Sequence, residues 1–335
     1  MPITPRRRAK RSFVMSKPSG KPLFPWLIQK VLVTGGAGFL GSFVVEALTA
    51  RGCGTVVVPR SRDYDLREAP VIQRLLSETN PSMIIHLAAQ CGGIGANQRN
   101  GARFFYDNAI MGIQLMELAR RHGIKKFVQV GTVCAYPGVT PVPFKEENLW
   151  NGYPEPTNAP YGLAKKMLLV QAQAYRRDYP DFDVIYLLPA NLYGPGDHFD
   201  LENSHVIPAL IRKIHEAISA NQTSIEVWGT GKASREFLYA GDAAEGIVLA
   251  AEKYSAGEPV NLGTGSSITI KDLVHLLCDL MDYKGRIIWN KSRPDGQMKR
   301  RLDVTRARKA FGFRARTSLR RGLKKTIEWY LAQSS

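Results

Sequence analysis

The sequence predicts an α/β protein: a Rossmann-type, doubly wound parallel sheet with a smaller C-terminal α/β lobe interleaved with it. Three observations lead to this fold class. Short apolar runs alternate with segments of helical periodicity, these runs are apolar at nearly every position, and a glycine-rich turn follows the first run. Alternating strands and helices give a parallel sheet covered on both faces, where strands are apolar throughout. We expect residues 30–190, joined by about 236–258, to form the sheet domain, and residues 191–235 with 259–335 to form the lobe.

Each expected element follows from its residue pattern. Short runs rich in valine, isoleucine and leucine predict five strands, at residues 30–34, 55–58, 83–87, 126–131 and 184–188. Apolar residues at three- and four-residue spacing predict the helices between and after them, at 39–51, 69–79, 101–122 and 161–179. After a loop-like stretch at 189–200, the same reasoning predicts helices at 206–220, 243–253, 270–281 and 319–332, with short extended segments at 236–239 and 260–262.

Composition and charge exclude several classes of protein. Of the 335 residues, 44% are apolar and 22% are charged, which excludes a mainly disordered, fibrous or disulfide-framework chain. The net charge of +17 is concentrated in two places: residues 1–21 hold seven basic side chains and no acid, and residues 284–325 hold sixteen against two acids. The rest of the chain carries a net charge of −4. We expect residues 1–29 to be a disordered basic tail, with a targeting peptide as the alternative.

Cysteine, histidine and hydropathy patterns narrow the remaining possibilities. The four cysteines form no CxxC pair, and five of the six histidines show no ligand spacing, so no metal site is expected. No apolar run approaches the roughly 18 residues of a membrane span, and because no apolar core follows the N-terminal basic residues, we expect no secretory signal. We therefore expect a cytoplasmic protein without a membrane partner.

The glycine-rich turn TGGAGFLG joins the first expected strand to the first expected helix. Glycines at Gly35, Gly38 and Gly41 permit a tight turn, let backbone amides approach a pyrophosphate, and let the helix pack closely on the strand. Phe39 and Leu40 open the helix, so their amides would face the same phosphates. The required strand and helix context is present, and it predicts a dinucleotide site.

The end of the second expected strand indicates which dinucleotide binds. A nicotinamide cofactor without a 2′-phosphate is usually met there by an acidic residue, but this strand ends in Arg60-Ser61-Arg62. Guanidinium groups suit a 2′-phosphate, so we expect NADP(H), the alternative being that these arginines are ordinary surface residues. The same crevice would be lined by Asp65 and Leu66, at the adenine, and by Ala88 and Ala89.

Tyr161 and Lys165 form a YxxxK pair on an expected helix. The ordinary pKa of tyrosine, near 10, is too high for acid catalysis at neutral pH, and a lysine one turn away on the same face would lower it. A YxxxK pair arises easily by chance, so its value rests on its place after the glycine loop and the fourth strand. Thr132, which follows that strand, carries a hydroxyl that could polarise the same carbonyl.

The glycine loop, the hydroxyl residue and YxxxK together resemble the extended short-chain dehydrogenase/reductases, and further segments are similar to the GDP-L-fucose synthase family. The most specific of them is NSHVIPAL at residues 203–210. The similarity spans about residues 30–332 and includes segments 91–97, 131–137, 155–161, 191–195, 235–238, 261–265 and 294–296.

This resemblance implies an NADPH-dependent enzyme that epimerises a GDP-4-keto-6-deoxy-hexose at C3 and C5 and reduces its C4 ketone. It implies Cys134 as the base and His205 as the acid, residue types that titrate nearest neutrality. Tyr161 would donate the proton for reduction, tuned by Lys165, while Thr132 holds the oxygen. The implied cofactor contacts include Tyr161, Lys165, Pro189, Asn191 and Leu192; the implied GDP-sugar contacts are Asn191, His205, Trp228, Arg235, Lys299 and Arg300. A homodimer built through helices of the sheet layer is also implied.

Departures from the family pattern leave two points open. Thr132 replaces the usual serine, and Gln297-Met298-Lys299-Arg300 replaces Thr-Pro-Arg-Lys, so the basic residue at the diphosphate is uncertain. The exact sugar is also open, since a colitose-type substrate lacking the 3-hydroxyl suits the same residues. Cys91, near the glycines of its loop, is interpreted as structural.

Alternative functions remain from two classes. The first is a GDP-mannose 3,5-epimerase or another nucleotide-sugar epimerase, which would recycle its cofactor. The second is a non-catalytic nucleic-acid-binding scaffold, supported only by the charge of +17; because the tail and one C-terminal stretch account for that charge, we expect no nucleic-acid partner.

Overall fold

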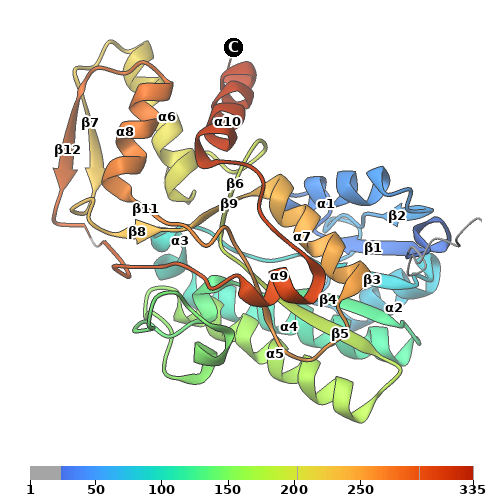
Figure 1. The fold of residues 1–335 in the computed structure, drawn as a ribbon. Coiled ribbons are helices and arrows are strands. Elements are labelled where there is room, and N and C mark those ends of the chain that lie inside the picture. Colours follow the sequence, from blue (N-terminus) through green and yellow to red (C-terminus); the bar gives the residue numbers. More distant parts are fainter. Residues whose placement is uncertain (1–23, 202, 294, 335) are drawn as a thin grey trace, which may run out of the picture.

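A six-stranded parallel sheet forms the centre of the molecule (Figure 1). The computed structural model describes residues 24–201, 203–293 and 295–334. The sheet order is β10-β5-β4-β3-β1-β2, with every neighbouring pair parallel. The chain passes from β1 to β2 on one side of β1 and then continues to β3 on its other side. Such a switch point opens a crevice at the carboxyl ends of the strands. The strands are β1 (Lys30–Thr34), β2 (Thr55–Val57), β3 (Met83–His86), β4 (Lys126–Val130), β5 (Asp183–Pro189) and β10 (Val260–Leu262).

Helices cover both faces of this sheet (Figure 1). On β1, Val31 and Val33 belong to the apolar cluster that holds α1 and α7, while Leu32 belongs to the cluster that holds α2 and α4. This alternation is what a strand with two buried faces requires. The fold class predicted from the sequence is confirmed. The covering helices are α1 (Phe39–Ala50), α2 (Ala69–Thr79), α4 (Gly101–Arg121), α5 (Ala159–Asp178) and α7 (Ala240–Lys253).

A second apolar cluster forms the smaller lobe. Its amphipathic helix α8 (Ile270–Leu280) buries Leu273, Val274 and Leu277, and its first turn is capped because the Thr269 hydroxyl accepts from the Asp272 amide at 3.0 Å. The other elements are helices α6 (Val206–Ser219) and α10 (Leu319–Ser334) and the parallel strands β7 (Ser224–Trp228) and β12 (Arg286–Asn290).

Short strand pairs connect the two parts of the molecule. Strand β6 (Asn191–Tyr193) pairs in parallel with β9 (Phe237–Tyr239), and β8 (Ser234–Arg235) pairs antiparallel with β11 (Ile268–Thr269). The sequence did not predict β6, β7, β8, β11 or β12. It also missed the short helices α3 (Ile94–Arg99) and α9 (Thr305–Phe311) and the 3₁₀ turns η2 (Val133–Ala135) and η3 (Glu146–Trp150).

The boundary predicted for the basic tail is wrong at its C-terminal end. Residues 26–28 form a 3₁₀ turn, η1 (Trp26–Ile28), in which Trp26 is buried. The Trp26 carbonyl accepts from the Gly54 amide at 3.0 Å, and the Gln29 carbonyl accepts from the Thr55 amide at 3.1 Å. Residues 24–29 therefore pack beside β2. The predicted disorder of residues 1–23 lies outside the described residues.

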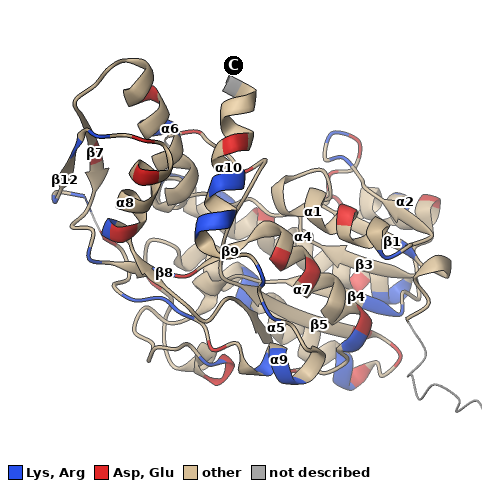
Figure 2. Cartoon of the chain, turned by 45° about the horizontal axis from the view of Figure 1, so that its top comes forward, with Lys and Arg blue, Asp and Glu red and all other residues tan. Residues whose placement is uncertain are grey.

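Basic residues of the 284–325 stretch lie on β12, α9 and α10, with acidic residues on neighbouring elements (Figure 2). Arg306 pairs with Glu147, and Arg320 pairs with Asp279 at 2.9 Å. Within the described residues, no helix is long and apolar enough to cross a membrane. The same part of the chain contains no group of three or more His, Cys, Asp or Glu side chains suited to a metal ion.

Candidate active site

A cleft of about 260 Å³ lies between the carboxyl edge of the sheet and the smaller lobe. Residues far apart in the chain line it, from the loops after β3 and β4 to the segment that precedes α9. It brings together seven residues that the sequence singled out: Cys134, Asn191, Leu192, His205, Trp228, Arg235 and Arg300.

The loop after β4 places Cys134 in the lining of the cleft, and Thr132, two residues earlier in the same loop, is buried. The Thr132 side chain accepts from the Cys134 amide at 3.2 Å and caps η2. A Cβ at position 162 would stand 2.3 Å from the Cys134 carbonyl oxygen, so Gly162 is required for α5 to pack against the loop. Tyr161, which precedes Gly162, makes a side-chain hydrogen bond with Thr132.

Burial dominates the electrostatics of Tyr161 and Lys165. It raises the pKa of Tyr161 well above its ordinary value, and the nearby thiols of Cys91 and Cys134 raise it further, against the hydrogen bond from Thr132. Burial also lowers the pKa of Lys165 to about 8. The Lys165 ammonium lies 3.4 Å from the Val130 carbonyl oxygen. Lys165 is not among the groups that shift the Tyr161 pKa in this structure, so the expectation that its charge lowers that pKa stays a prediction.

His205 enters the cleft from the other part of the molecule. It precedes α6 as its N-cap residue and is exposed toward the cleft. Surrounding protein lowers its pKa, and the charge of His198 lowers it further. The imidazole is therefore mainly neutral at neutral pH, although its position in an open cleft leaves it accessible to a ligand.

Two residues that the sequence did not assign to the site interact electrostatically with its members or with each other. Cys91 interacts electrostatically with Tyr161, Lys165 and Cys134, and its interpretation as structural stays a prediction. Asp197 is buried, its Oδ1 accepts from the His198 amide at 2.7 Å, and burial raises its pKa to about 7. A lone cysteine and a lone aspartate in irregular loops carry no local pattern that could have identified them.

Arginines from two segments form the lobe side of the cleft. The half-buried Arg235 guanidinium donates to the carbonyl oxygens of Ser234, Asp295 and Gln297 at 2.9, 2.9 and 2.5 Å. Burial, together with the charge of Arg300, lowers its pKa to about 10, so it stays charged at neutral pH. Arg300 is buried and its Nη1 donates to the Cys134 sulfur at 3.7 Å.

Lys299 does not join this arrangement. It is exposed and is not among the described residues that line the cleft. In the parallel bridge of this segment to Ser234, the Ser234 amide donates to the Met298 carbonyl and the Arg300 amide donates to the Ser234 carbonyl. Successive residues of an extended segment point to opposite sides, so Lys299 and Arg300 face different ways. Both Lys299 and Arg300 are predicted to contact the GDP-sugar, and of the two only Arg300 lines the described cleft.

Trp228 provides the aromatic surface of the cleft and remains 44% exposed. The Arg293 guanidinium carbon lies 4.7 Å from the centre of its ring, and the Lys213 nitrogen lies 5.9 Å from it. Cations held over an aromatic face leave the ring ordered and its remaining surface available for stacking.

The turn of residues 35–41 forms a cradle for a dinucleotide, and it has positions that only glycine can occupy. Gly35 has φ +71°, and a Cβ there would stand 2.8 Å from the Ala88 nitrogen. A Cβ at Gly41 would stand 2.0 Å from the Gly35 oxygen. Gly38 is the N-cap of α1 and provides no capping side chain, so the first amides of the helix, including those of Phe39 and Leu40, suit a phosphate. These residues fit a dinucleotide.

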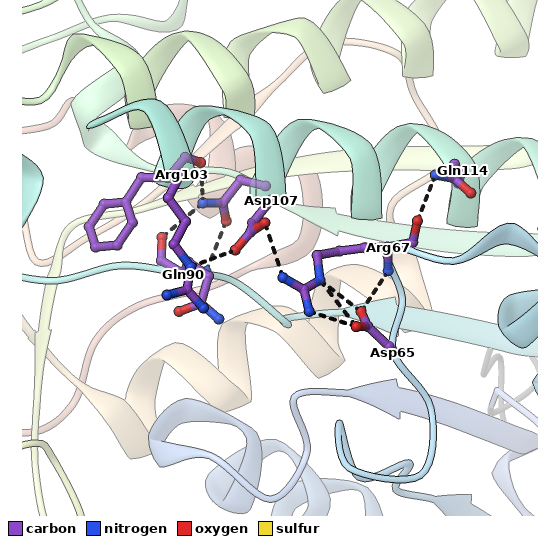
Figure 3. A network of polar contacts seen from close by, with 8 residues as sticks. Asp65, Arg67, Gln90, Arg103, Asp107 and Gln114 are labelled. Atoms are coloured by element: carbon purple, nitrogen blue, oxygen red, sulfur yellow. Dashed lines mark hydrogen bonds and ion pairs between the residues drawn. The ribbon is translucent and has the colours of Figure 1, made fainter. Parts of the chain in front are cut away.

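A polar network holds two other loops of this cradle (Figure 3). Asp65 pairs with Arg67 at 2.7 Å, which lowers the pKa of the Asp65 carboxyl, and Arg67 lies 3.5 Å from the buried Asp107. Arg103 approaches Asp107 from the other side at 3.3 Å. The next residue of α4, Asn108, accepts from the Gln90 amide at 3.1 Å and donates to its carbonyl at 2.8 Å.

Consecutive residues of α4 therefore fix both the loop at Asp65–Leu66 and the loop after Ala88–Ala89. Arg60 lies exposed beyond the end of β2, and its carbonyl accepts from the amides of Asp63 and Tyr64, the residues that precede the first of these loops. Pro189 ends β5, paired with Leu262, while Asn191 and Leu192 line the cleft.

Comparisons with known proteins agree with this geometry. Residues 31–263 match the NAD dependent epimerase/dehydratase family. The chain is 37% identical to a GDP-L-fucose synthase of Sinorhizobium fredii, covering 91% of this chain and 96% of that protein, and 34% identical to a GDP-L-colitose synthase of Yersinia pseudotuberculosis, covering 91% and 99%. A GDP-L-fucose synthetase from Naegleria fowleri bound to NADP has a similar structure, with a TM-score of 0.83, 28% identity and coverage of 92% and 95%. The chain thus belongs to the GDP-L-fucose synthase family, within the NAD dependent epimerase/dehydratases.

Proposed function

We propose that this protein epimerises a GDP-4-keto-6-deoxy-hexose at C3 and C5 and then reduces C4 with NADPH, giving GDP-L-fucose or a close relative. The observation that carries the proposal is one cleft shared by Cys134, His205, Arg235, Arg300 and Trp228. A thiol and an imidazole suit proton transfer at carbon, and the arginines and the indole suit a nucleoside diphosphate.

The cradle supports NADP(H) as the cofactor. Gly35, Gly38 and Gly41 leave room for a pyrophosphate, and Arg60 supplies a guanidinium where a 2′-phosphate would lie. The related Naegleria fowleri structure is described as bound to NADP. The cofactor, when bound, supplies hydride for the C4 ketone.

Epimerisation uses the acidity that the C4 ketone confers on its neighbouring carbons. Cys134 removes a ring proton, which passes to its sulfur and leaves an enolate. His205 returns a proton from the other face, so configuration inverts without net change in atoms. Because its pKa is lowered, protonated His205 is a stronger acid than free imidazole but is present at a lower fraction at neutral pH.

Reduction uses the groups at the end of β4. The raised pKa of Tyr161 keeps its phenol protonated at neutral pH, so the phenol carries the proton that it donates to the C4 oxygen. The Thr132 hydroxyl, hydrogen bonded to Tyr161, holds the same oxygen. Lys165 is mostly charged at pH 7, since its pKa is about 8, and its charge compensates the phenolate that forms.

Incubation with NADPH and GDP-4-keto-6-deoxymannose tests the proposal. We expect one NADPH oxidised for each GDP-L-fucose formed. Oxidation only with the analogue lacking the 3-hydroxyl would redirect the assignment to a colitose-type sugar. Epimerised product without net NADPH consumption would indicate an epimerase instead, and no reaction with either sugar would contradict the proposal.

The quaternary part of the proposal is a homodimer formed through α4 and α5. These helices pack on each other and leave Phe105, Tyr106 and Val170 partly exposed. Tyr106→Glu should convert a dimer to a monomer in light scattering, because a buried charge opposes the contact. Val139→Glu, which changes a 92% exposed loop residue, is the matched control. A wild-type monomer would contradict this part.

A further inference from the structure

Arg300 is a buried cation that lacks a carboxylate partner. Only 7% of its surface is exposed, and no Asp or Glu among the described residues lies within ion-pair distance of it. Burying a guanidinium without an anion is unfavourable. Its two side-chain contacts are the Cys134 sulfur, 3.7 Å from Nη1, and the Gln297 oxygen, 3.1 Å from Nε.

Gln297 ties this arginine to the loop that carries the thiol. Its Nε2 donates to the carbonyl oxygens of Gly138 and Pro137 at 2.9 and 3.4 Å, while its Oε1 accepts from Arg300. Both ends of the amide are used, and exchanging them would place like groups together. One side chain thus fixes Arg300 relative to the loop of residues 134–138.

The other titratable groups near Cys134 are one cation that donates to other acceptors and two acids that are uncharged. Arg235 is close enough to interact with Cys134 electrostatically, but its guanidinium donates to three backbone carbonyls. Cys91 and Tyr161 are neutral acids with raised pKa values. Arg300 is therefore the cation whose N–H reaches the sulfur.

We propose that Arg300, held by Gln297, is the counter-ion that favours the thiolate form of Cys134. The thiolate is the form that can accept a ring proton; it becomes a thiol when the enolate forms, and it is regenerated when that proton leaves to solvent. Arg300 acts through Cys134 and is a positioning residue in this role. The effect of Arg300 on Cys134 does not depend on the proposed function; only the use of the thiolate to remove a ring proton rests on it.

Alkylation of the free enzyme tests the contact without substrate or turnover. The rate at which iodoacetamide modifies Cys134 at one neutral pH is followed by mass spectrometry of its peptide, with Cys53 in the same sample as the internal reference. Iodoacetamide is uncharged, so loss of an arginine does not change its attraction to the site. We expect Arg300→Met to slow Cys134 alkylation about tenfold, because only the thiolate reacts.

Companion variants separate charge from structure. Arg300→Lys should restore the rate to within about threefold, because it keeps the cation, and Gln297→Thr should slow it by an intermediate factor of about three. Lys299→Met removes a neighbouring exposed charge and should leave the rate within about twofold. Far-ultraviolet circular dichroism checks the fold; if Arg300→Met does not fold, Gln297→Thr decides the question.

The proposal is overturned if Arg300→Met alkylates at the wild-type rate, if Arg300→Lys slows alkylation as much as Arg300→Met does, or if Gln297→Thr alkylates at the wild-type rate. None of these results depends on turnover. Failure of the wild type to oxidise NADPH would count against the proposed function alone, so the two failures are distinguishable.

Discussion

The sheet side and the lobe side of the cleft hold their functional groups by different means. Thr132 and Cys134 follow a buried strand, and α5 packs against their loop at Gly162, so regular secondary structure places them. Arg235 and Arg300 lie in short or irregular segments and are held by polar contacts to residues up to 166 positions away. The sheet side is held by packing against the core, whereas the lobe side is held by individual hydrogen bonds. We therefore expect substitutions of the reducing groups on the sheet side to lower kcat, and substitution of the nucleotide-binding surface on the lobe side, such as Trp228, to raise KM.

Tyr161→Phe should give the largest effect. It removes the phenol proton donor, and reduction at C4 should fall about 10³-fold. Exchange of ring protons with solvent, which uses Cys134 and His205, should continue. Steady-state NADPH oxidation and NMR exchange measure the two steps separately.

Tyr136→Phe is the matched control, since this buried phenol of the same loop donates to Asn261 at 2.8 Å. It should lower stability by about 1 kcal/mol with little change in reduction. Equal losses in both variants would show that packing, not proton donation, explains the effect.

Arg60→Ala tests the cofactor end of the sheet side. Loss of a charge-assisted contact to a 2′-phosphate should weaken NADPH binding about 30-fold and leave NADH binding nearly unchanged. Fluorescence titration with both cofactors gives the ratio. Arg74→Ala, an exposed arginine of α2 lying over the Tyr64 ring, should not change that ratio. An unchanged preference in Arg60→Ala would mean that Arg60 is only a surface residue.

The pH profile of reduction tests Lys165. Its pKa is lowered to about 8, so raising the pH through 8 removes its charge. We expect kcat/KM for reduction to fall about tenfold per pH unit beyond that point. Stability should change in the opposite sense: the unfolded chain binds this proton more tightly, so the contribution of Lys165 to folding rises with pH between about 8 and its ordinary value. A flat rate profile to pH 10 would contradict a role for the charge.

Trp228→Ala tests the lobe side. Loss of its stacking surface should raise KM about fivefold and leave kcat within a factor of two. Trp150→Ala is matched to it: this tryptophan is 55% exposed and also carries a cation, with Lys166 at 4.5 Å. If kcat instead fell and KM stayed constant, the division between chemistry and affinity would be wrong.

Asp107→Asn should have the smallest effect. Removing the carboxylate shared by Arg67 and Arg103 loosens the loop of Asp65, which the network of Figure 3 holds. Because both arginines are substantially exposed, we expect only about threefold weaker NADPH binding. Isothermal titration measures it, with Glu78→Gln of α2 as a surface control. A tenfold or larger loss would show that the network governs the cofactor site.

The same contrast explains what could be predicted from the sequence. The turn after β1, α1 and the helix of Tyr161 follow from local periodicity and short spacings, and the structure has them. Strands β7 and β12 lie about sixty residues apart, and part of each is exposed, so no local pattern indicates their pairing. The choice of Arg300 over Lys299 depends on which side of one extended segment faces the cleft. The raised pKa of Tyr161 depends on burial, which spacing cannot supply.

Product analysis by NMR after reaction in deuterated water tests most directly the claim that one cleft carries out both epimerisation and reduction. The hydrogen isotopes in a single product molecule record both steps. The account predicts solvent deuterium at C3 and C5 of the sugar and none at C4, where hydrogen comes from NADPH. In Cys134→Ser, deuterium at C3 and C5 should be suppressed. Deuterium at neither carbon in the wild-type product, or unchanged incorporation in Cys134→Ser, would contradict it.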